Sequence, residues 1–199
     1  MAVNRGAPVT DEGKARDILA AARELFGQLG YDKTGVRDIA KRADVAVTTV
    51  YAHFGQGKAA ILEAVLMDLV QRLVEHIVAT PEQEPVEHFF EQVRRLNRGL
   101  ADDPLLRRLR SEHGRLPEPR LRERGRQIEE KFHSIAVARL RELDADGLIR
   151  CADPEAVATL LRVTTRGWLQ ARDDGREQVA HDRVLEALLE SVRALVVET

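Results

Sequence analysis

The chain has 199 residues, of which 44% are hydrophobic and only 4% aromatic, so the composition excludes a disordered chain and predicts a core of aliphatic side chains. Its 31 basic and 33 acidic residues give a formal net charge of -2, which excludes any argument for nucleic-acid binding from bulk charge. The single cysteine excludes an internal disulfide, and the absence of a secretory leader and of ~18 consecutive apolar residues predicts a cytoplasmic protein.

Apolar residues recur at intervals of three and four along the whole chain, which is the spacing of helices rather than strands. Helix punctuation agrees, because Gly30 follows the first apolar stripe, and Asp103-Pro104 and Asp153-Pro154 each combine an N-cap with a helix-opening proline. The predicted helices run over roughly 12–29, 36–43, 47–54, 58–79, 82–101, 104–113, 119–146, 154–173 and 177–197. The sequence therefore predicts an all-α fold of about nine helices.

The first three predicted helices differ in length and are joined tightly. A long helix ends at Gly30, and Thr34 is the expected N-cap of the short helix that follows. Only residues 43–46 separate that short helix from the next one. Two short helices joined by such a turn are typical of a helix-turn-helix unit, in which the first turn of the second helix can enter the major groove of DNA.

The second helix of this unit divides into an inner and an outer face. Val50 and Phe54 lie one turn apart and are expected to pack inward. Val47, Thr48 and Thr49 then lie on the outer face of the first turn, where hydroxyl groups can bond base edges and methyl groups can meet thymine methyls. This helix is therefore the candidate recognition helix.

Side chains suited to phosphate contacts lie nearby. Tyr51 and His53 follow on the same helix, and Lys58 opens the next one. Residues 1–58 hold nine basic and seven acidic residues, so this segment has a net charge of +2 while the remainder is close to -4. The local charge modestly favours DNA binding by this segment alone.

The segment from Gly30 to Phe54 contains an aromatic after glycine, then threonine, Val-Arg-Asp-Ile-Ala and Tyr-x-x-Phe, and a lysine follows it. In this pattern the segment resembles the TetR family of bacterial transcriptional regulators. The resemblance implies a flexible arm over 1–11, a DNA-binding domain over 12–72 and a helical domain for ligand binding and dimerisation over 73–199. The residues expected to contact DNA are Thr34, Arg37, Val47, Thr48, Thr49, Tyr51, His53 and Lys58.

Three positions depart from the family pattern. Asp44 stands where glycine is usual in the turn, and Ala46 replaces a serine that would cap the recognition helix. Between Phe54 and Lys58 lie residues 55–57, one residue more than is usual. These departures leave open a weakened DNA contact, including a loss of the phosphate role of Lys58.

The middle helices of the second domain supply candidates for a ligand pocket. A large ring one turn from a hydroxyl, as in Trp168 and Thr164, suits a mostly apolar ligand with one polar group. The alternative is that these side chains belong to the core or to a dimer contact. The predicted pocket residues are Phe89, Phe132, Leu161, Thr164, Thr165 and Trp168.

Arginines are frequent in the same part of the chain. They can attract an anionic ligand such as an acyl-coenzyme A, although a solvated helix face explains them equally well. The residues concerned are Arg94, Arg95, Arg98, Arg107, Arg108 and Arg110.

The final predicted helix has an apolar stripe wide enough to face its own core and a partner helix together. In the family that the chain resembles, the last two helices form a dimer interface, so a homodimer is expected. A helix buried within a monomer is the alternative. The predicted interface residues are Val184, Leu185, Leu188, Leu189, Val192 and Leu195.

The resemblance implies a ligand-responsive regulator, in the simplest case a homodimeric repressor that leaves a palindromic operator when a small-molecule inducer binds. The sequence has no phosphate-binding glycine-rich loop, no nucleophile elbow and no His-Glu-x-x-His zinc motif, so no catalytic residue, metal or cofactor is expected. Two alternatives remain, a ligand-binding helical dimer with weakened DNA binding and a small helical enzyme.

Overall fold

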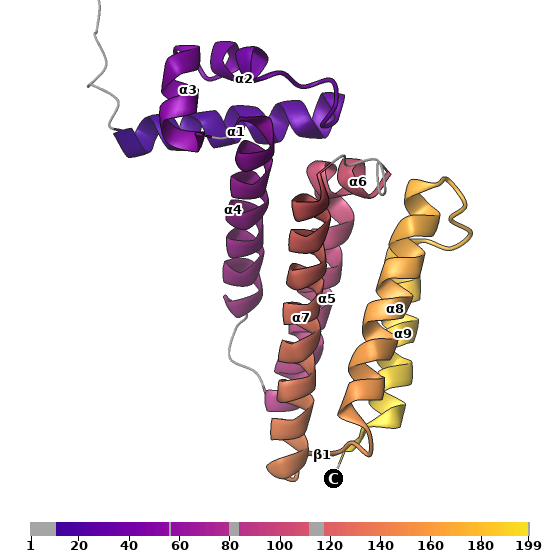
Figure 1. Cartoon of the computed structure of the whole chain (residues 1–199). Helices are drawn as coiled ribbons and strands as arrows, with labels where there is room; N and C mark the ends of the chain where they lie inside the picture. The colour runs from indigo at the N-terminus through magenta and orange to yellow at the C-terminus, as the bar shows by residue number, and fades with distance from the viewer. Residues whose placement is uncertain (1–10, 56, 80–83, 112–117, 199) are drawn as a thin grey trace, which may run out of the picture. The chain divides into compact units, whose positions relative to one another are not determined.

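The computed structural model of the chain describes residues 11–55, 57–79, 84–111 and 118–198 (Figure 1). In chain order the elements are α1 (Asp11–Leu29), α2 (Val36–Arg42), α3 (Val47–Phe54), α4 (Lys58–Val78), α5 (Pro85–Asp102), α6 (Pro104–Ser111), α7 (Pro119–Ala145), β1 (Ile149–Arg150), α8 (Pro154–Asp173), α9 (His181–Leu195) and β2 (Val197–Glu198). The predicted helical fold class is confirmed. Residues 1–10 of the predicted arm lie outside the described residues, and Asp11 already belongs to α1.

The chain divides into two compact units, residues 1–69 and residues 70–199. We call the first unit the head and the second the body. α4 supplies residues to both units, its first half to the head and the rest to the body. Among the residues that the structure describes, no helix is both long enough and apolar enough to cross a membrane.

The core of the head forms where α1, α2, α3 and the start of α4 bury one apolar face each. On α1 the buried residues Ile18, Ala22 and Phe26 recur every four positions, the spacing of a helix stripe. Gly30 follows with a φ of 83°, a left-handed conformation that ends the helix and that glycine adopts without strain. The other helices contribute Ile39, Ala40, Val50, Ile61, Leu62 and Val65 to the buried set.

The core of the body is built from the facing sides of α5, α7, α8 and α9, which run alongside one another in Figure 1. Phe89 and Phe90 meet edge to face, with their ring centroids 5.5 Å apart. Around them, aliphatic side chains from the other three helices complete the cluster, among them Leu140, Leu161 and Leu185. The core is therefore mostly aliphatic, as the low aromatic content predicts.

A short antiparallel strand pair accompanies the predicted helices. In this pair Ile149 lies opposite Glu198, and Arg150 lies opposite Val197. Gly147, with a φ of 71°, reverses the chain between α7 and β1. Strands of two residues are too short to show the alternation by which strands are predicted.

Two helices begin later than their apolar patterns predict. α9 begins at His181 rather than near residue 177, and the indole nitrogen of Trp168 donates to the carbonyl of Val179 in the segment before it (3.4 Å). α5 begins at Pro85 rather than near residue 82, because proline fits the first turn of a helix but not its interior.

The edges of α5 and α9 are joined by charged side chains, which we call the α5–α9 ion-pair row. Its pairs are Glu87–Arg193 (2.7 Å), Arg94–Glu186 (2.8 Å) and Arg98–Asp182 (3.4 Å). Residue numbers rise along α5 while they fall along α9, as an antiparallel pair requires. Hydrogen bonds from the arginines lower the pKa of Glu87 and the pKa of Glu186 below their ordinary values.

Candidate nucleic-acid interface

α2 and α3 are joined by a turn whose geometry depends on one residue. Asp44 has a φ of 54°, the left-handed conformation that glycine adopts most easily. The amide of Val45 then donates to the carbonyl of Ala40 (3.0 Å), which closes the end of α2. Asp44 therefore holds the position at which the family pattern has glycine, and the helix-turn-helix forms with aspartate in that place.

Thr34 has a different role from the one predicted. Its side chain is buried, and its hydroxyl donates to the carbonyls of Gly30 (2.8 Å) and Leu25 (3.3 Å) at the end of α1. The N-cap of α2 is Gly35 instead, and its amide donates to the carboxylate of Asp38 (3.1 Å). Because the hydroxyl is occupied inside the head, Thr34 leaves the set of candidate DNA contacts.

The candidate recognition helix α3 has the two faces that its sequence predicts. Val50 is fully buried, while Thr48 and Tyr51 are exposed, the latter to 48%. Val47 and Thr49 are partly exposed beside them. Hydroxyl and methyl groups thus line the accessible part of this helix, where they can meet the edges of bases.

The start of α3 has no side-chain cap. Ala46 is its N-cap and accepts only through its carbonyl, from the amide of Thr49 (2.9 Å). Arg37, on α2, is exposed and adds a cation to the helix-turn-helix. The first-turn amides of α3 and this guanidinium are groups of the kind that bind phosphate oxygens.

His53 is less accessible than its predicted phosphate role requires. Its side chain is 15% exposed, and Nε2 lies 3.3 Å from a carboxylate oxygen of Asp11. This contact joins the last turn of α3 to the first residue of α1. The geometry makes His53 a link between these two helices.

Lys58 has partners within the head that sequence reasoning missed. Its ammonium donates to the carbonyls of Tyr31 (2.8 Å) and Asp32 (3.4 Å), in the turn between α1 and α2. The same nitrogen lies 4.3 Å from the centroid of the Tyr31 ring. We call these contacts the Lys58 clamp, and they compete with the phosphate contact predicted for this residue.

Several of the predicted ligand-pocket residues have partners inside the body. Phe89 and Leu161 are buried in the core of the body. Thr165 donates to the side-chain oxygen of the buried Asn97 (2.7 Å), and Trp168 stacks on His181 with ring centroids 4.2 Å apart. Phe132 and Thr164 are partly exposed. These contacts favour the alternative that the sequence left open, in which such side chains belong to the core.

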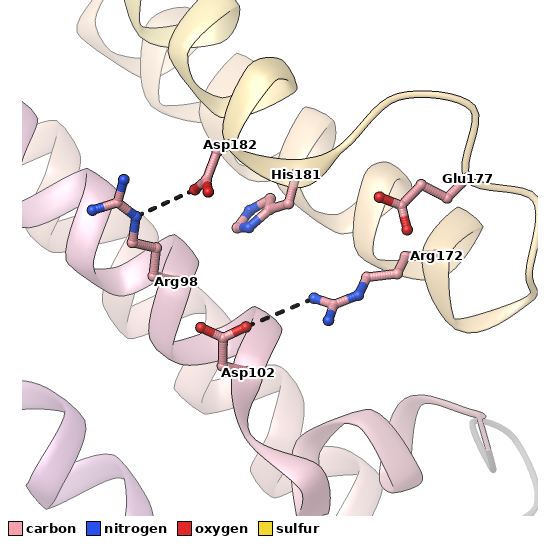
Figure 2. Close-up of a pocket in the computed structure, with 6 residues that line it drawn as sticks. All are labelled: Arg98, Asp102, Arg172, Glu177, His181 and Asp182. Atoms are coloured by element: carbon pink, nitrogen blue, oxygen red, sulfur yellow. Dashed lines mark hydrogen bonds and ion pairs between the residues drawn. The ribbon is translucent and has the colours of Figure 1, made fainter.

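A polar hollow of about 310 Å³ lies where the ends of α5 and α8 meet the start of α9 (Figure 2). None of the predicted pocket residues lines it. Burial lowers the pKa of His181, which favours a neutral ring at neutral pH. The lining residues are Arg98, Asp102, Arg172, Glu177, His181 and Asp182.

Several of the arginines proposed to attract an anionic ligand are already paired with carboxylates. Besides those of the α5–α9 ion-pair row, Arg95 pairs with Glu91 (3.0 Å) and Arg110 with the buried Asp173 (2.6 Å). Their charges are thereby neutralised within the body. In the part of the chain that the structure describes, no three histidine, cysteine or acidic side chains are placed to hold a metal ion.

The predicted dimer stripe on α9 mostly faces the interior of its own chain. Leu185, Leu188, Leu189 and Val192 are buried in the core of the body. Val184 is partly exposed, and Leu195 is exposed to 56%. Four of the six residues of this stripe therefore pack in the chain's own core, and Val184 and Leu195 are its more accessible members. The apolar residues exposed on the neighbouring α8 are Leu160 and Val163, at 39% and 59%.

Comparison with known proteins shows that this head is similar to bacterial regulatory proteins. Residues 18–65 match the profile described as bacterial regulatory proteins, tetR family. An uncharacterized HTH-type transcriptional regulator of Bacillus subtilis, YdeS, is 34% identical over 88 residues, or 44% of each chain. The HTH-type transcriptional repressor KstR of Rhodococcus jostii is 31% identical over 93 residues, or 47% of this chain and 43% of KstR. The chain therefore aligns with less than half the length of these curated relatives.

Solved structures are similar over more of the chain. A TetR-family transcriptional regulator from Mesorhizobium loti is 23% identical, with a TM-score of 0.73 over 95% of this chain and 99% of that one. At this level of identity the likeness shows the fold. It covers 95% of the chain, more than the alignments with the curated relatives do.

Proposed function

We propose that this chain, whose residues 18–65 match the profile of the tetR family of bacterial regulatory proteins, is a DNA-binding regulator of transcription, as the resemblance of residues 30–54 to that family predicts. In this proposal it acts in the cytoplasm as a homodimeric repressor. A small molecule bound by the body releases it from a palindromic operator. The helix-turn-helix supports the proposal most directly, since its recognition helix buries Val50 and exposes Thr48 and Tyr51.

The proposed DNA contacts divide by chemistry. Val47, Thr48 and Thr49 meet base edges in the major groove, because hydroxyl and methyl groups discriminate between base pairs there. Tyr51 and Arg37 bind phosphate oxygens and fix the register of the head on the duplex.

A homodimer follows from the small size of one head. A single short recognition helix reads few bases, whereas two heads ~34–36 Å apart read both halves of a palindrome. The exposed apolar side chains Leu160 and Val163 on α8, with Leu195 on α9, are the residues we propose for the contact between two bodies. They replace the buried part of the predicted α9 stripe in this role.

Release by a ligand requires that the body and the head be coupled. α4 supplies residues to both units, so a ligand that favours one position of its second half alters how the two heads of a dimer are spaced. A coupling free energy of about 1–3 kcal/mol is typical of such systems.

The experiment that tests this function is selection of DNA duplexes from a random-sequence library by the purified protein. The expected result is a palindromic consensus bound by two chains, with an affinity that falls steeply as salt rises. Recovery of no consensus, together with weak binding of equal strength to every duplex, would contradict it. The ligand-binding dimer with weakened DNA binding would then stand, favoured by the left-handed Asp44 and the uncapped start of α3.

A further inference from the structure

We propose that Lys58 is a positioning residue for DNA binding. Through the Lys58 clamp it holds the start of α4 to the turn between α1 and α2, and it acts on DNA by placing the helix-turn-helix rather than by touching a phosphate. The inference rests on the proposed function of the head, but the clamp itself is a contact within the chain.

The partial charges at the end of α1 and at the start of α4 explain why the ammonium of Lys58 interacts favourably with the end of α1. The last turn of α1 contains no basic residue, although the carbonyl end of a helix carries a partial negative charge. The Lys58 ammonium supplies the missing cation from another helix. Its two hydrogen bonds satisfy carbonyls of Tyr31 and Asp32, which follow the last turn of α1.

The same position is unfavourable for α4 itself. Lys58 is the first residue of that helix, where the partial charge is positive, and the first turn of α4 has no acidic residue to offset it. A cation there repels its own helix end. The favourable interactions of the ammonium therefore lie across the helices, with the α1–α2 turn.

The turn that receives the ammonium is itself firmly held. Tyr31 is buried and stacks on Phe26 with ring centroids 5.9 Å apart. The hydroxyl of Thr34 bonds two carbonyls at the end of α1. The Lys58 clamp thus attaches α4 to a rigid point, so a displacement of the start of α4 must either move the turn or break the clamp.

The clamp has a direct consequence for the recognition helix. α2 begins at Val36, directly after the turn that the Lys58 clamp holds, and α3 is the next helix along the chain. The position of α4 relative to the helix-turn-helix is therefore set partly by one ammonium group. Losing that group should leave the head folded at low temperature but its recognition helix less well placed.

The test uses three variants of the full-length chain. Lys58→Met keeps the aliphatic stem over the Tyr31 ring but removes the charge and the donors. Lys58→Arg keeps both. Lys33→Met is the matched control, because it removes one positive charge from an exposed lysine in the same turn. Thermal unfolding is measured for each variant, as is the affinity for the duplex selected by the wild-type protein, at several salt concentrations well below the unfolding temperature.

Lys58→Met is expected to lower the unfolding temperature of the head by several degrees and to weaken duplex binding by about tenfold, or about 1.4 kcal/mol. The slope of log affinity against log salt should stay unchanged, because no phosphate contact is lost. Lys58→Arg should restore most of the affinity, and Lys33→Met should leave the unfolding temperature unchanged.

Two results would overturn the inference. A slope reduced by about one in Lys58→Met would make the lysine a direct phosphate contact. A lower unfolding temperature with unchanged affinity would make it a purely structural residue. Failure of the wild-type protein to select any duplex would instead count against the proposed function, and the comparison of unfolding temperatures between Lys58→Met and Lys33→Met would still test the clamp.

Discussion

The head and the body are both helical and both contain ion pairs, among them His53–Asp11 in the head, but the α1–α2 turn and the α5–α9 contact are held in different ways. In the head, Thr34 and Lys58 bond main-chain carbonyls in and around the α1–α2 turn. In the body, charged side chains bond one another, along the α5–α9 ion-pair row and in the part-buried pair Arg110–Asp173. The bonds in the head hold the α1–α2 turn in place, whereas the ion pairs in the body hold packed helices together. Substitutions in the head should alter DNA binding most, and substitutions in the body should alter stability and its dependence on pH.

The largest expected effect comes from removing a buried ring in each unit. Phe26 in the head and Phe90 in the body are both at most 1% exposed. Each change to alanine should cost about 3–5 kcal/mol, because it leaves a cavity that the surrounding helices fill only in part. Hydrogen exchange resolved along the chain should show faster exchange confined to the unit that carries the change.

Binding of the selected duplex provides a second test of whether the head and the body unfold separately. Phe26→Ala should abolish it under conditions in which the helices of the body remain protected from exchange. Equal loss of protection in both units from either single change would show that they unfold together, contrary to the division into two compact units.

The next largest effect concerns the outer face of the recognition helix. Thr48→Ala should reduce the preference for the selected duplex over a scrambled one by ~1–3 kcal/mol, the range of a specific base contact. Thr48→Ser keeps the hydroxyl and removes the methyl group, so it separates a hydrogen bond from a thymine contact. An unchanged preference in both variants would exclude this side chain from base recognition.

A smaller effect, in this case a gain in stability, is expected from a change in the turn between α2 and α3. Asp44 has a φ of 54°, and glycine adopts that conformation without the steric cost of a Cβ. Asp44→Gly should therefore stabilise the head by up to about 1 kcal/mol, and Asp44→Ala should destabilise it. Urea titration monitored by circular dichroism measures both changes. Equal stabilities for the glycine and alanine variants would show that backbone strain at this turn is negligible.

The smallest expected effect tests the ion-pair row of the body. A hydrogen bond from Arg94 lowers the pKa of Glu186 below its ordinary value near 4.5 in the folded state. The ionised carboxylate thus stabilises the fold above that pH, and this contribution is lost as the pH falls through the lower folded-state pKa. Because Glu186 is partly exposed, solvent screening limits its contribution to below about 1 kcal/mol.

Urea titrations at pH 7 and pH 3.5 measure this contribution. Glu186→Gln should lower stability at pH 7 and have less effect at pH 3.5. Glu190→Gln, an exposed glutamate on the same helix, is the control and should be neutral at both. A Glu186→Gln penalty of the same size at both pH values would contradict an ionic origin.

Much of the head could be predicted because its signals are local. The alternation of inner and outer residues on α3 places Val50 correctly, and the TetR-like pattern locates the left-handed turn at Asp44. The partners of Thr34 and Lys58 could not be predicted in the same way. A hydroxyl or an ammonium can bond any nearby carbonyl, and the sequence does not reveal which carbonyls the fold brings within 3 Å.

In the body, the sequence does not predict which surface packs against the apolar face of a helix. The stripe on α9 correctly indicates burial of Leu188 and Val192, but periodicity does not distinguish the chain's own core from a partner. The same limit applies to the predicted pocket residues, since Phe89 and Leu161 are apolar side chains that pack within the core. The strand pair was missed because two residues carry no period.

The proposal that the head binds DNA through α3 can be tested by a hydrogen-exchange footprint of the protein with its selected duplex. Slower exchange is expected across residues 36–51, together with little change along α7 and α9 beyond that caused by the same amount of a scrambled duplex. Protection confined to the body, or identical protection by the selected and the scrambled duplex, would contradict the claim.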